Sequence, residues 1–163
     1  MAVTYEPITT TTFNGSTSTV TFSSISSAYT DLRIVVNALS TNNALYMRFN
    51  SDSGTNYSFN ALQGSAATIS ANNSTNESLI NTGAFDTTYP SLILIDVFSY
   101  ASAVQKAVLC IQATDTNSTG TYMKYTTGSW NSTTTVNSIT LWASGSTNFA
   151  SGGTITIYGI KAA

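Results

Sequence analysis

The sequence has very little charge and no histidine. Only 7% of its 163 residues are Asp, Glu, Lys or Arg, against roughly a quarter in ordinary globular domains. The lack of histidine excludes Ser-His-Asp and Cys-His catalytic arrangements and nearly all transition-metal sites. The five basic residues are scattered and the net charge is −2, so we expect no nucleic-acid partner.

Cysteine and long apolar segments are also scarce. Cys110 is the single cysteine, so the chain forms no internal disulfide, and its apolar neighbours predict a small core residue. The first seven residues contain neither a basic nor a long apolar segment, and we therefore expect no signal peptide and synthesis in the cytoplasm. The densest apolar run, Leu92 to Val97, contains Asp96 and is too short to cross a bilayer, so we expect no membrane insertion.

Small hydroxyl and amide residues take the place of the missing charges. The chain has 29 Thr, 24 Ser and 15 Asn, and 42% of its residues are hydrophobic. Thr and the β-branched and aromatic residues favour strands, whereas Ser, Asn and Gly favour turns. Because the strong helix formers Glu, Lys, Gln and Arg are rare, the composition predicts an all-β protein.

Short segments of alternating hydrophobicity recur between clusters of turn residues, with no helical period between them. We predict about eight or nine strands in two antiparallel sheets, a jelly-roll-like β-sandwich, with an immunoglobulin-type sandwich as the alternative. Leu92–Phe98 is nearly all apolar, which predicts a central strand covered on both faces. The segments are Thr17–Phe22, Asp31–Leu39, Leu45–Phe49, Ser78–Asn81, Leu92–Phe98, Ala107–Ile111, Tyr122–Tyr125, Ile139–Ala143 and Ile155–Ile160.

No shift in composition marks a second domain, so residues 1–163 are expected to form a single β-sandwich domain. Residues 1–12 are a candidate N-terminal arm that contacts neighbouring molecules. Residues 51–77 are polar and break the rhythm of the strands, which predicts a long functional loop or an irregular hairpin at a sheet edge.

Asp96 and the acidic segment Asn50 to Gly54 each have both a chemical and a structural interpretation. Asp96 lies inside an apolar strand, and a buried partner for one of the arginines or an exposed position on an edge is favoured over a functional acid. The segment Asn50 to Gly54 resembles a calcium loop but lacks its glutamate, so a tight turn with Asx hydrogen bonds is favoured. We expect no enzymatic activity, no metal and no cofactor.

Aromatic residues in or beside polar segments give the one positive sign of binding. They are candidates for stacking on sugar rings or anchoring a protein interface, and the alternative is that they close the open ends of the sandwich. The candidate interface residues are Tyr5, Tyr57, Phe59, Tyr122, Tyr125 and Trp130.

Two segments carry a resemblance to a known group of proteins. Tyr46 to Ser58, with the sequence YMRFNSDSGTNYS, resembles the F-N-x-D-x-G-x-N-Y-S signature of small virion proteins of tailed bacteriophages. The ending Gly153 to Ile160, GTITIYGI, is similar to the closing strand of the same proteins, and YTDLRI at Tyr29 to Ile34 precedes both in the expected order.

The resemblance implies a jelly-roll building block of a phage particle, located in the virion. We expect a capsid decoration or cement protein that binds the major capsid protein and stabilises the shell, and a low-charge surface suits a homotrimer. The alternative is a tail-fibre or tail-tip domain that recognises a host-surface glycan. A free carbohydrate-binding module is the third possibility.

Overall fold

The computed structural model describes residues 4–41, 44–65, 67–116 and 122–161. These residues form two antiparallel sheets and one short 3₁₀ turn, Ser144–Ser146. The twelve strands are β1 (Thr4–Thr12), β2 (Thr19–Phe22), β3 (Asp31–Ala38), β4 (Ala44–Phe49), β5 (Tyr57–Ser65), β6 (Thr68–Glu77), β7 (Ile80–Ala84), β8 (Ser91–Phe98), β9 (Lys106–Thr114), β10 (Tyr122–Trp130), β11 (Ile139–Ala143) and β12 (Thr154–Lys161). The expected all-β sandwich of two antiparallel sheets is confirmed.

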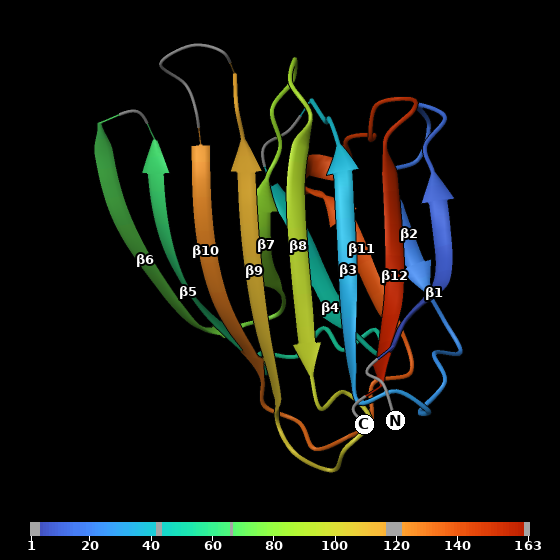
Figure 1. The fold of residues 1–163 in the computed structure, drawn as a ribbon. Helices are drawn as coiled ribbons and strands as arrows, with labels where there is room; N and C mark the ends of the chain where they lie inside the picture. Colours follow the sequence, from blue (N-terminus) through green and yellow to red (C-terminus); the bar gives the residue numbers. More distant parts are fainter. Residues whose placement is uncertain (1–3, 42–43, 66, 117–121, 162–163) are drawn as a thin grey trace.

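The two sheets differ in size. The large sheet has eight strands in the order β1-β12-β3-β8-β9-β10-β5-β6, and the small sheet has four in the order β2-β11-β4-β7. Figure 1 shows the large sheet in front and the small sheet behind it. The described residues thus contain more strands than the eight or nine expected, and the sheets are unequal.

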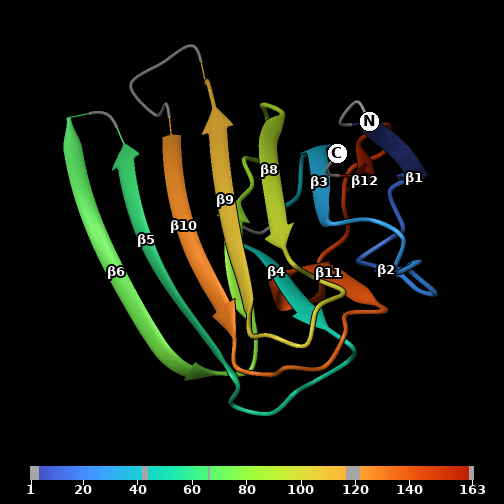
Figure 2. The ribbon, with the colours of Figure 1, turned by 60° about the horizontal axis from the view of Figure 1, so that its bottom comes forward.

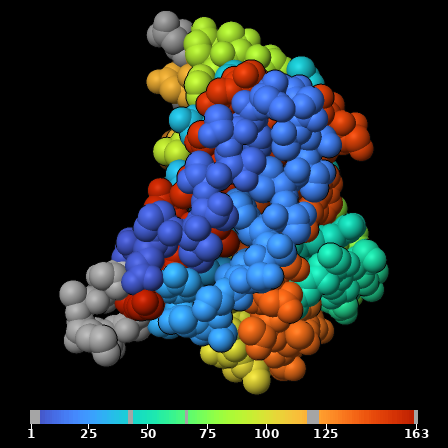
Figure 3. Space-filling model, turned by 90° about the vertical axis from the view of Figure 1, so that its right-hand side faces the viewer, coloured from blue at the N-terminus to red at the C-terminus, as the bar shows by residue number. Residues whose placement is uncertain are grey.

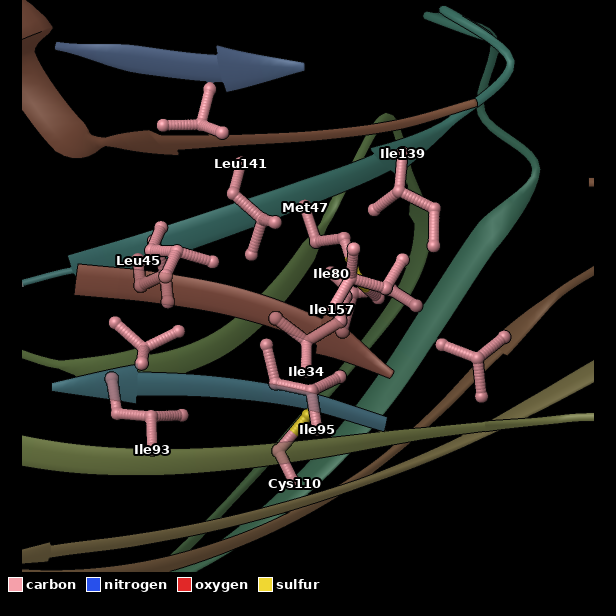
Figure 4. Packing of buried hydrophobic residues seen from close by; sticks show 14 of the residues in the cluster. Ile34, Leu45, Met47, Ile80, Ile93, Ile95, Cys110, Ile139, Leu141 and Ile157 are labelled. Atoms are coloured by element: carbon pink, nitrogen blue, oxygen red, sulfur yellow. The ribbon is translucent and has the colours of Figure 1, made fainter. Parts of the chain in front are cut away.

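Alternation along the strands places the core between the sheets. In β3 and β8 every second residue is buried, including Ile34, Ile93 and Ile95, as the period of two requires. Met47 of β4 and Leu141 of β11 meet them from the small sheet (Figure 4). Each fully buried side chain of this size contributes about 1.5–3 kcal/mol to stability relative to an exposed one.

Cys110 lies in this core and is fully buried, as its apolar neighbours predict. Burial raises the pKa of its thiol well above the ordinary value, because the low-dielectric core disfavours the thiolate. The thiol is therefore a packing group and a poor nucleophile.

The β5–β6 hairpin extends the large sheet beyond the small one. Figure 2 shows it standing away from β4 and β11 at the edge of the molecule. The buried residues of β5 are at its beginning, where Tyr57 and Phe59 face the core, whereas every residue of β6 is exposed or half-buried. Most of the polar segment 51–77 is this edge hairpin.

The N-terminal segment is part of the large sheet. Thr4–Thr12 pairs with β12 along its whole length, with one register shift between Pro7 and Thr9. In Figure 3 this strand, in dark blue, crosses the face that is turned toward the viewer. From Thr4 onward the candidate arm is thus an edge strand, and its first three residues lie outside the described part of the chain.

Candidate binding surface

Three of the six candidate interface residues lie in the core. Tyr57, Trp130 and Phe59 have exposed fractions of 1%, 2% and 9%. Tyr57 and Trp130 stack with ring centroids 6.2 Å apart, and Phe49 packs against both. These side chains close one end of the sandwich, so their surfaces are occupied by one another instead of being available to a ligand.

A carboxylate organises this end of the sandwich. Asp52 Oδ2 accepts hydrogen bonds from Trp130 Nε1 at 2.7 Å and from Asn56 Nδ2 at 2.9 Å, and Oδ1 accepts one from the backbone N–H of Gly54. These donors, Trp130 first, hold the pKa of Asp52 below its ordinary value. The Asx turn expected here is confirmed, and Asp52 belongs to the fold.

The neighbouring asparagine joins a second loop to the same turn. Asn50 has a positive φ of 51°, and its side-chain oxygen accepts hydrogen bonds from the N–H groups of Asn137 and Ser138. Its amide donates to the carbonyl of Thr135 at 2.8 Å. Asn adopts the left-handed region more readily than most residues. The Asn and Asp of the F-N-x-D motif are therefore structural positions.

Packing also explains the glycine of the Tyr-Gly-Ile ending, Gly159. A Cβ added to Gly159 would lie 2.3–2.5 Å from the ring of Tyr29, closer than any real contact. The backbone N–H of Thr30 also donates to the carbonyl of Ile160 at 2.8 Å. The Tyr29–Ile34 and Gly153–Ile160 anchors thus pack against each other.

The other three candidates lie on the large sheet with different exposure. Tyr122 is half-buried and its hydroxyl donates to Gln63 Oε1 at 2.6 Å. Tyr5 is 49% exposed, and the Arg33 guanidinium lies 5.5 Å from its ring centroid. Tyr125 is 45% exposed. The structure does not bring the six residues together in one site.

The outer face of the large sheet, which points away from the small sheet, carries most of the exposed apolar surface. Along β8, β9 and β10 the residues between the buried ones point outward, and many are apolar. Leu92–Phe98 is therefore covered on one face only, contrary to the sequence-based expectation, because the small sheet covers one side. The large exposed apolar residues of this face are Tyr5, Leu62, Ile69, Leu92, Phe98, Met123 and Tyr125.

The outer face has few charged side chains, and two of them neutralise each other. Arg33 and Asp96 project from neighbouring strands and form a two-pronged ion pair, with both N–O distances 2.6 Å. This confirms the interpretation of Asp96 as an arginine partner. The pair raises the pKa of Arg33, since the carboxylate stabilises the charged guanidinium.

A shallow hollow of about 420 Å³ interrupts the outer face at the β5–β6 hairpin. Asn60, Asn73 and Thr127 give it uncharged polar groups, and Leu62 and Tyr125 give it apolar surface. A smaller hollow borders it between β5 and β10, next to Ser58 and Ser129. Amide and hydroxyl groups beside an exposed aromatic ring can bind a neutral polar ligand.

Sequence reasoning missed the outer face because it assumed that every apolar strand residue is covered. The signal was present in Leu92, Leu94 and Phe98, which occupy the second face of a strand whose first face is also apolar. Leu62 and Ile69 stand among polar residues and gave no periodic signal.

The described residues were also compared in their capacity for metal binding and for crossing a membrane. They contain no group of three or more His, Cys, Asp or Glu side chains placed to hold a metal ion. No helix in the same residues is long and apolar enough to cross a membrane. Comparison of the chain with protein-family models, with curated proteins and with solved structures gives no significant match.

Proposed function

We propose that this chain is a structural protein of a tailed-bacteriophage particle, where it attaches to the shell as a decoration or cement protein. The observation that carries the proposal is the outer face of the large sheet, which is broad, apolar and almost free of net charge. Interface cores are poor in charge and rich in aromatic residues and Met, and this face has that composition.

The size of the outer face supports a stable protein contact. Eight strands about 4.8 Å apart give a width of roughly 34 Å, and strands of about eight residues give a length of roughly 27 Å. The product, about 900 Å², matches the roughly 800 Å² that each partner contributes to a standard interface. Apolar residues occupy part of this area, among Thr and Asn residues and the Arg33–Asp96 pair, and an exposed apolar patch of a few hundred Å² often marks a protein contact.

The order of the strands supports a jelly-roll interpretation. If the hairpins β5–β6 and β9–β10 are set aside, the remaining strands form two four-stranded sheets, β1-β12-β3-β8 and β2-β11-β4-β7. Successive strands of this set alternate between the sheets except at β4 and β7, which are neighbours. We infer a jelly roll whose large sheet is extended by two inserted hairpins, which widen the outer face.

Binding to particles that lack the protein tests the proposal. The double variant Leu92→Ser/Met123→Ser removes apolar groups from the outer face, and we expect it to bind the shell at least about tenfold more weakly than wild type. The matched control is Tyr89→Ser/Val104→Ser, which alters exposed apolar residues outside the strands. Unchanged binding by the first variant, with both variants folded by circular dichroism, would overturn the assignment of this face.

The hollow beside Tyr125 favours a second candidate, a tail-tip domain that binds a neutral host-surface glycan. The copy number per particle separates the two. A cement protein is present in numbers comparable to the shell subunits, and a tail tip in a handful of copies. Tyr125→Ala abolishes adsorption to host cells under the tail-tip proposal and leaves it unchanged under the cement proposal.

A further inference from the structure

Strand β6 is the outermost strand of the large sheet, and its outer edge is open. Its single strand neighbour among the described residues is β5. From Thr68 to Ser74 the pairing with β5 has no register shift, and the irregularity follows beyond Ser74. Seven consecutive residues therefore present a regular edge on which the backbone N–H and C=O groups of alternate residues point to solvent.

The other sheet edges have features that discourage pairing. β1 contains Pro7, has a register shift beside it, and bears the Glu6–Lys161 ion pair at 2.9 Å. β2 has only four residues. β7 packs against β9 and β10 of the large sheet. Proline, bulges, charges, short length and coverage are the ways in which proteins protect sheet edges.

None of these features protects the regular part of β6. Its sequence from Thr68 to Ser74, TISANNS, has no proline and no charged residue, and Glu77 is the first charge. Ile69 is 78% exposed, the largest value among the big apolar side chains of the described residues. A long, uncharged, regular edge with an exposed Ile is typical of a strand that pairs with another chain.

We propose that β6 pairs antiparallel with β6 of a second copy of this chain, which joins the two large sheets into one continuous sheet. Pairing centred on Ala71 places Ser70 opposite Asn72 of the second copy, and Ile69 opposite Asn73. The small Ala71 side chains meet at the two-fold axis. This assembly is independent of whether the outer face binds a phage shell.

The features of the strand select a second copy as the partner. An antiparallel pair of identical strands is self-complementary about a two-fold axis. Because residues 68–74 are uncharged, pairing places no like charges opposite each other. The apolar surface of Leu62 and Tyr125 lies next to β6 on the outer face, so the joined sheet continues this face across the junction.

The two-fold symmetry differs from the homotrimer expected from composition. A β6–β6 contact uses the same edge on both molecules and closes after two copies, whereas a trimer needs two different edges. Sedimentation therefore distinguishes them, with a mass of twice or three times 17.2 kDa.

Charge reversal with rescue tests the pairing. We expect wild type to sediment as a dimer in the micromolar range, and Ser70→Lys/Asn72→Lys to be monomeric because four lysines meet at the junction. Ser70→Glu/Asn72→Glu is expected to be monomeric as well, and an equimolar mixture of the two variants to restore the dimer. The matched control, Thr10→Lys/Thr12→Lys on the opposite edge strand, is expected to stay dimeric.

Hydrogen exchange locates the contact. Alternate amides of residues 68–74 are expected to exchange slowly in wild type and in the mixture, and quickly in each variant alone. Three results would each overturn the proposal. They are a wild-type protein that stays monomeric even at a concentration 100-fold above that used for the variants, a wild-type trimer, and a dimer that persists in Ser70→Lys/Asn72→Lys. Partnership with an extended segment of another protein would instead appear as β6 protection only in the presence of that protein.

Discussion

Single polar residues hold together the end of the sandwich where the strands change direction. Asp52 accepts from Trp130, Asn56 and Gly54, and Tyr57 lies beside it with its hydroxyl within reach of three backbone groups. The sequence showed these residues as a polar turn with nearby aromatic side chains. That the rings turn inward could not be predicted, because it depends on β10 lying next to β5.

Asp52→Ala is expected to destabilise the protein by about 1–3 kcal/mol, because the partly buried Trp130 N–H loses its acceptor. The pKa of Asp52 is lowered in the folded state, so its stabilising contribution is present above the ordinary value of 3.8 and is lost as the pH falls through the folded-state pKa. Urea titrations in the acid range are expected to show this loss in wild type, and a smaller loss in Asp52→Ala. Equal acid sensitivity of the two proteins would contradict the prediction.

Tyr57 gives the corresponding prediction at alkaline pH. Burial raises its pKa to about 12, so the unfolded chain loses this proton first and stability falls as the pH rises from about 10 to about 12. In Tyr57→Phe we expect lower stability at neutral pH, because the N–H of Phe49 loses its acceptor, and a shallower alkaline decline. Chemical denaturation at several pH values measures both.

At the scale of strands, the sequence predicted best those strands in which apolar residues alternate with polar ones. β3, β4, β8 and β12 have a buried residue at every second position, and the sequence predicted all four. β6 was predicted only through the alternative of an irregular edge hairpin, and β1 was expected to be an arm: β6 buries no residue and β1 consists largely of Thr. Both owe their conformation to hydrogen bonding with a neighbour, which leaves no hydrophobic pattern in the sequence.

The contact between β12 and the segment before β3 gives a prediction at this scale. Gly159→Ala is expected to displace the Tyr29 ring and to destabilise the protein by about 1–3 kcal/mol. Gly64→Ala is the control, since a Cβ there meets nothing within 4 Å. Thermal unfolding should separate the two variants, and equal midpoints would show that Tyr29 moves away without cost.

On the scale of the whole molecule, the large sheet leaves its outer face and the edge formed by β6 uncovered in the described residues. The prediction of a β-sandwich from composition and spacing was confirmed, but each sheet of a two-layer sandwich is covered on its inner face only, so the second apolar face of β8 stays exposed. The large sheet has four strands more than the small one because both hairpin segments, Tyr57–Glu77 and Lys106–Trp130, join it. No local pattern tells which sheet a hairpin joins, so the sequence could not reveal how wide the outer face is, although Leu92, Leu94 and Phe98 already indicated that it is partly apolar.

Low charge leads to a prediction about ionic strength. Contacts made by the outer face and by β6 contain few charges, so we expect the self-association constant to change by less than about threefold between roughly 0.05 M and 1 M salt. Sedimentation equilibrium at both salt concentrations measures it. A steep weakening at high salt would indicate that ion pairs hold the copies together.

The pairing of β1 with β12 also determines how the domain responds to pulling. Thr4 lies opposite Lys161, so the chain enters and leaves at the same end of one antiparallel pair (Figure 1). A force applied through the two ends loads the hydrogen bonds of this pair one after another, as in a zipper, and β1 peels off at low force. A force applied through the outer face would be distributed over several strands at once, so we expect the domain to resist it better than a force applied through its two ends.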